Sequence, residues 1–167
     1  MTNPAGNKFV YVTYIRTTPE KLWTALTDAE FNKKFWFGTH QESSWKPGSP
    51  WRLVFEDGRT ADAGEILEVE ANRRLVIRWR NEFRPELRDE GYSRCTMELE
   101  PLEDAVKLTI THGLEGPGEK FVEAVSGGWP KILSNLKSLL ETGDVAFRQA
   151  YPANANPHGS TDIPARS

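Results

Sequence analysis

The chain has 167 residues, a formal net charge of -3, a pI near 5.7 and one cysteine. This length suits a single domain with its own core. The acidic balance argues against a nucleic-acid partner, and a lone cysteine excludes an internal disulfide. No stretch resembles a signal peptide or approaches the roughly 18 apolar residues that span a bilayer, so a cytoplasmic protein without membrane insertion is expected.

The N-terminal third predicts one strand followed by two short helices. Residues 8–16 are rich in β-branched and aromatic side chains, as strands are. A threonine cap at Thr18, followed by Pro19 and Glu20, marks a helix start. That helix runs to about Asp28, and a second is expected over residues 29–35. Residues 36–50 are predicted to be an aromatic connection.

The middle of the chain predicts short strands that follow one another through turns. The strands are expected at residues 51–56, 59–70, 75–80, 92–100 and 105–112. Asp57 and Gly58 form a strong hairpin signal, and Gly64 indicates a bulge or a close backbone approach. Residues 81–91 are expected to be a charged loop. Because no helix intervenes between these strands, the sheet should be antiparallel.

One long amphipathic helix is predicted over residues 121–141. Its apolar residues recur at steps of three and four, and Gly143 stands where a helix ends. Pro130 lies inside this pattern and follows Gly127 and Gly128, which predicts a kink or a late helix start with Trp129 at the bend.

The chain is expected to divide into three parts. Residues 1–7 should be flexible, residues 8–142 should form the folded domain, and residues 143–167 are proline-rich, polar and mostly disordered by composition. Val145, Phe147 and Tyr151 could dock locally onto the domain.

Several short matches, in the right order, resemble one known superfamily. They are Thr18-Pro19-Glu20-Lys21-Leu22-Trp23 with Ala25-Leu26-Thr27-Asp28, Gly48 before Trp51, Asp57-Gly58, Gly64-Glu65-Ile66, Arg74-Leu75-Val76 through Trp79, and Gly128-Trp129 followed by Leu133, Leu136 and Leu140. This order resembles the START-like (SRPBCC) superfamily over residues 8–142. The closer likeness is to the branch related to the C-terminal domain of the activator of Hsp90 ATPase.

The resemblance implies an α+β helix-grip fold. A curved antiparallel sheet of six to seven strands would wrap the long C-terminal helix and leave a hydrophobic cavity between them, and two short helices would follow the first strand. Pro130, directly after Gly-Trp, departs from the expected pattern, and the C-terminal tail is an addition to the common core.

Strand alternation predicts an apolar wall facing the helix. The inward residues are expected to be Trp51, Leu53, Phe55, Leu75, Ile77, Trp79, Cys95, Met97, Leu99, Val106, Leu108, Ile110 and His112. The alternatives at this point are a ligand cavity and a solid core; six tryptophans and the resemblance favour the cavity. Its expected lining is Trp36, Phe37, Trp51, Phe55, Ile77, Trp79, Cys95, Met97, Ile110, His112, Val125 and Trp129.

No catalytic constellation stands out. His112 could fix a ligand or could be a hydrogen-bonded histidine at a strand end, and Cys95 is expected to be an inert core thiol. Three scattered histidines and one cysteine predict no metal site, and no cofactor is expected. Arg78 and Arg80 should pair across the sheet with Glu65, Glu98 or Glu100.

Three functional hypotheses follow. The first is non-enzymatic binding of a small hydrophobic, aromatic or lipid-like, molecule. The second, implied by the resemblance, is a co-chaperone module with an Hsp90-type partner, which would connect the protein to the stress response. The third is a hydrolase- or cyclase-like cavity enzyme with His112 as its base. A monomer and a homodimer are both compatible with the sequence.

Overall fold

The structure is a computed structural model that describes residues 8–148. The residues predicted as the flexible N-terminus, 1–7, and the part of the predicted tail from 149 to 167, including Tyr151, lie outside the described residues. The strands are β1 (Lys8–Ile15), β2 (His40–Ser43), β3 (Pro50–Val54), β4 (Thr60–Glu70), β5 (Arg74–Asn81), β6 (Ser93–Pro101) and β7 (Val106–Leu114). The helices are α1 (Pro19–Thr27), α2 (Ala29–Phe35), α3 (Pro85–Arg88) and α4 (Lys120–Thr142).

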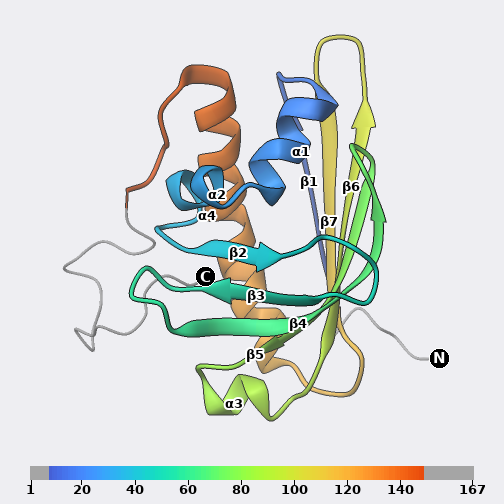
Figure 1. Cartoon of the computed structure of the whole chain (residues 1–167), viewed down its shortest axis with the longest axis vertical. Helices are drawn as coiled ribbons and strands as arrows, with labels where there is room; N and C mark the ends of the chain where they lie inside the picture. The colour runs from blue at the N-terminus through green and yellow to red at the C-terminus, as the bar shows by residue number, and fades with distance from the viewer. Residues whose placement is uncertain (1–7, 149–167) are drawn as a thin grey trace.

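The seven strands form one antiparallel sheet in the order β1-β7-β6-β5-β4-β3-β2. The sheet curves around α4, while α1 and α3 lie toward opposite ends of the molecule (Figure 1). The α+β class and the antiparallel sheet are confirmed. Strand β2 was not predicted, because the connection that contains it has few β-branched residues and reads as a loop.

The inward face predicted by alternation is confirmed. The thirteen strand residues expected to face the helix are all buried, and none is more than 5% exposed. Gly64 is confirmed at a close approach: a Cβ there would lie 1.7 Å from the carbonyl oxygen of Arg78 on β5. The Asp57-Gly58 turn joins β3 to β4, with Gly58 at a φ of 95°.

Short helices begin where cap residues predict them. The side chain of Thr18 accepts a hydrogen bond from the backbone N–H of Lys21 at 3.2 Å, and Asp28 accepts one from Phe31 at 3.0 Å. Each cap satisfies a backbone donor that the first turn leaves without a helical partner.

Helix α4 is continuous through the proline. It begins at Lys120, ten residues before Pro130, so the predicted late start is wrong. Burial of one helix face outweighs the lost hydrogen bond at Pro130. Gly143 ends the helix with a φ of 89°, as expected.

Two expectations for the charged face are corrected. Residues 81–91 are not only a loop, because they contain α3, a single turn opened by Pro85. Arg78 pairs with Glu115 and Arg80 with Glu82, rather than with the predicted glutamates. The long arginine side chains extend toward the strand ends, and this determines their partners. The strand register alone does not predict such pairs.

Candidate functional site

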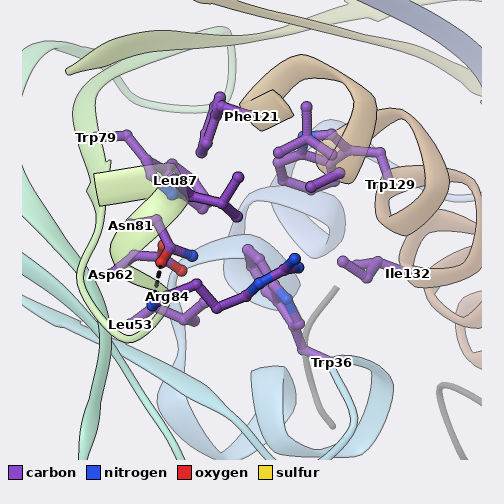
Figure 2. Close-up of a pocket in the computed structure, with 12 residues that line it drawn as sticks. Trp36, Leu53, Asp62, Trp79, Asn81, Arg84, Leu87, Phe121, Trp129 and Ile132 are labelled. Atoms are coloured by element: carbon purple, nitrogen blue, oxygen red, sulfur yellow. Dashed lines mark hydrogen bonds between the residues drawn. The ribbon is translucent and has the colours of Figure 1, made fainter. Parts of the chain in front are cut away.

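A narrow crevice lies where the ends of β4 and β5 meet α3 and the first turns of α4. Figure 2 shows the side chains around it. Its lining consists of Trp36, Leu53, Asp62, Trp79, Asn81, Arg84, Leu87, Phe121, Ala124, Val125, Trp129 and Ile132. The sheet, the α2–β2 connection, α3 and α4 therefore all contribute to one site.

The apolar wall of the crevice is a set of indole rings in contact with one another. The ring centroids of Trp36 and Trp129 are 5.5 Å apart, and those of Trp79 and Trp129 are 6.0 Å apart. Behind them, Trp51 packs against Trp79 at 4.4 Å. Aromatic rings at such separations attract one another beyond simple burial of area.

The space enclosed by this wall is small. It measures about 30 Å³, which suffices for a water molecule, whereas pockets for drug-sized guests measure roughly 300–1,000 Å³. The crevice is therefore too small for such a guest in this conformation. A guest larger than water requires that part of the lining move.

Polar groups converge at one end of the crevice. Asp62 and Asn81 are opposite each other in the β4–β5 register and are each 3% exposed. Asn81 Oδ1 accepts a hydrogen bond from the backbone N–H of Arg84 at 2.8 Å, which fixes the chain just before α3. The guanidinium of Arg84 extends across the crevice in Figure 2 and is bound by Glu86.

His112 lies behind the crevice in a chain of hydrogen bonds. An indole nitrogen can only donate, so Trp129 Nε1 donates to His112 Nδ1 at 3.0 Å. The proton of the neutral ring is then on Nε2, which lies 2.9 Å from Ser93 Oγ. Ser93 in turn donates to the carbonyl oxygen of Trp79 at 2.8 Å.

Burial sets the protonation of His112 and Cys95. Desolvation lowers the pKa of His112 to about 3 and raises the pKa of the Cys95 thiol. His112 is therefore neutral at physiological pH, and the lone pair that a general base would use is already occupied by Trp129. Cys95 is a thiol rather than a reactive thiolate.

The predicted lining residues divide into two groups. Trp36, Trp79, Val125 and Trp129 line the crevice. Phe37 is partly buried against the core, and the remaining seven are buried outside the lining: Trp51, Phe55, Ile77, Cys95, Met97, Ile110 and His112.

The sequence reasoning missed the polar end of the crevice. Strand alternation could have found two of its members, because Asp62 shares a face with Ile66, and Asn81 shares one with Ile77 and Trp79. Arg84 and Leu87 carried no comparable signal, since they lie in the segment predicted as a charged loop.

Two absences concern residues 8–148, the part of the chain that the structure describes. No group of three histidine, cysteine, aspartate or glutamate residues there could hold a metal ion. In the same part of the chain, no helix is both long and apolar enough to cross a membrane.

Comparison with protein families gives a match over most of the domain. The family described as "Activator of Hsp90 ATPase homolog 1-like protein" matches residues 16–141. The chain belongs to this family. A comparison with curated proteins gives no match.

Solved structures agree with membership of the Hsp90-activator-like family. PFC0360w, an HSP90 activator from Plasmodium falciparum, is 25% identical, with a TM-score of 0.65 over 80% of this chain and 96% of that chain. MLL2253 from Mesorhizobium loti is 24% identical, with a TM-score of 0.69 over 83% and 99%. The Aha1 dimer from Colwellia psychrerythraea is 20% identical, with a TM-score of 0.66 over 81% and 97%. The last two likenesses show the shared fold, which is the START-like helix-grip.

Proposed function

We propose that this protein binds a small hydrophobic molecule, aromatic or lipid-like, in the crevice between the sheet and α4, without transforming it. The observation that carries the proposal is the composition of the crevice. Indole rings form its wall, and Asp62, Asn81 and Arg84 converge at one end. An apolar wall with a few placed polar groups is typical of sites that bind and orient small molecules.

The chemistry of the site supports binding rather than catalysis. A base must have a free lone pair within reach of its substrate. In His112 that lone pair accepts the Trp129 hydrogen bond, and the ring does not line the crevice. The proposed role of the indoles is to stack on the guest and that of the polar end is to orient it.

The test is a titration with the fluorescent probe anilinonaphthalene sulfonate (ANS), monitored by quenching of tryptophan emission. Saturable binding is expected. The variant Ala124→Leu adds bulk to the crevice wall and should weaken the affinity roughly tenfold, the usual order for an apolar group of this size. Its matched control is Ala71→Leu in the exposed β4–β5 turn, which should leave the affinity unchanged. Absence of saturable binding, or equal affinity in both variants, would overturn the proposal.

A second candidate is activation of an Hsp90-type chaperone. It is favoured by the family match over residues 16–141 and by the likeness to the Plasmodium activator. The full chain added to an Hsp90 ATPase should raise its turnover if this candidate holds. An unchanged rate at saturating concentrations would eliminate this candidate. Ala71→Leu, the folded control variant, is tested at the same concentration.

A further inference from the structure

We infer that α3 and the first turns of α4 form a single lid that opens the crevice by hinging at Gly127, Gly128 and Pro130. The inference rests on the proposed function for its purpose, which is to admit a guest. The movement itself does not depend on that function: one part of α4 moves while the other stays fixed. Because the space in the crevice is only about 30 Å³, some such movement is required for any guest larger than water.

A carboxylate joins the two pieces of the lid. Glu90, just after α3, accepts hydrogen bonds from the backbone N–H groups of Lys120 at 3.0 Å and Phe121 at 2.8 Å. These are two of the donors that the start of a helix leaves without a partner, and a negative charge is favourable there. Gly118 permits the approach, because a Cβ at that position would lie 2.8 Å from the Glu90 carboxyl carbon.

The middle of α4 has the composition of a hinge. Gly127 and Gly128 are among the residues least favourable to a helix, and Pro130 has no N–H to donate to the carbonyl of Ser126. These residues separate Phe121, Ala124 and Val125, which line the crevice, from the rest of the helix.

The part of α4 beyond the hinge is tied to the body of the protein. Trp129 donates to His112 on β7, and Asn135 donates to the carbonyl oxygen of Phe35 at 3.3 Å. Further along, Lys137 binds the carbonyl oxygen of Tyr14, and Glu141 accepts from the N–H of Arg16 at 2.8 Å. Trp129 is therefore the pivot, and the lid lies on its N-terminal side.

Opening at this hinge would separate two sides of the crevice. Leu87 on α3 and Phe121, Ala124 and Val125 on α4 would leave with the lid. Trp36, Trp79 and Asn81 would stay with the sheet and α2 and would present their faces to a guest (Figure 2). The polar end would remain mostly in place while the apolar wall opened.

Hydrogen–deuterium exchange on the free full-length protein tests the movement without any ligand. Amides of residues 122–127 should exchange at least tenfold faster than those of residues 132–139 in the same helix. Equal protection along the helix would overturn the inference.

Two substitutions should stiffen the hinge. Gly127→Ala adds a Cβ that meets nothing within 4 Å, and it should slow exchange of residues 122–127 about fivefold through helix propensity. Pro130→Ala restores the donor for Ser126 and should slow exchange further. The matched control is Gly116→Ala in the β7–α4 loop, where a Cβ also meets nothing within 4 Å and where α4 exchange should not change.

Weakening the Glu90 contact between α3 and α4 should have the opposite effect, because the first turn of α4 is then held less firmly. Glu90→Gln removes the charge and should speed exchange in residues 120–127, with no change in residues 132–139. Stopped-flow mixing of the same variants with ANS then measures how opening of the lid limits the rate of association. Association should be faster in Glu90→Gln and slower in Pro130→Ala, and equal rates would overturn the inference. If ANS does not bind at all, the proposed function fails, and the exchange experiment still decides whether the lid moves.

Discussion

The two halves of α4 are held in different ways. The C-terminal half lies over β1, β7 and α2, where Leu133 and Leu136 are at most 1% exposed and Asn135 is hydrogen-bonded to neighbouring backbone. The N-terminal half packs on the one-turn helix α3, contacts His112 on β7 through Phe121, and is held by the Glu90 carboxylate. The comparison shows that a single helix can serve as core on one side of a glycine–proline interruption and as a movable wall on the other.

Removing the pivot between the halves should have the largest effect. Trp129→Ala empties a buried ring position and leaves His112 Nδ1 without its donor, so the free energy of unfolding should fall by about 3–5 kcal/mol. Urea denaturation measures it. Trp129→Phe keeps most of the side-chain volume and loses the hydrogen bond, so the free energy of unfolding should fall by a smaller amount, about 1–3 kcal/mol. A loss below 1 kcal/mol in the alanine variant would show that the pivot is not anchored.

Because His112 contacts the fixed half, the free energy of unfolding should also depend on pH. The pKa of His112 is lowered to about 3 in the folded state by burial, whereas an unfolded histidine titrates near 6.5. Between these values only the unfolded state binds the proton, so the free energy of unfolding should fall as pH falls. The slope approaches about 1.4 kcal/mol per pH unit well below pH 6.5, and the total change between pH 6.5 and 4.5 is about 2.3 kcal/mol.

A comparison with a variant that lacks His112 isolates that slope. Carboxylates with lowered pKa values, such as Glu115 and Glu141, lose their stabilising effect mainly below about pH 4.5, outside this window. Denaturation of His112→Gln should therefore show a flatter profile between pH 6.5 and 4.5. An equally steep profile in the variant would assign the slope to other groups.

Matched leucine truncations compare the two regions directly. Leu108→Ala, in the fixed core on β7, should cost about 2–5 kcal/mol. Leu87→Ala, on α3, should cost about 1–2 kcal/mol, because the lid can detach locally without unfolding the sheet. Both side chains are buried, so burial alone predicts equal losses. Equal losses in urea denaturation would argue that α3 belongs to the core.

The fold was predictable because its signals are local and repeated. Alternation placed the inner face of the sheet from Trp51 to His112, and Thr18, Gly58 and Gly143 marked a cap, a turn and a helix end. The errors lie where tertiary contacts override local preference. Pro130 is accommodated inside α4 because the helix is buried on one face, and β2 forms because β3 offers it a partner.

The site was predictable only in part, because a crevice is a relation between distant segments. The sequence indicated that tryptophans would gather, but not that Trp36, Trp79 and Trp129 would touch and leave only about 30 Å³. Glu90 shows the same limit, since its 31-residue separation from Phe121 has no local signature.

The smallest effect on stability is expected at the mouth of the crevice. The Arg84–Glu86 pair is exposed on both sides, and such pairs contribute about 0–1 kcal/mol, so Arg84→Ala should change the free energy of unfolding by less than about 1 kcal/mol. Because its side chain belongs to the polar end that is proposed to orient the guest, its loss should nevertheless weaken ANS binding severalfold (Figure 2). Arg59→Ala, which removes another exposed arginine pair at the β3–β4 turn, is the control and should change neither quantity appreciably. A severalfold loss of binding with almost no change in stability would support a direct role of Arg84 at the mouth, whereas unchanged binding would contradict it.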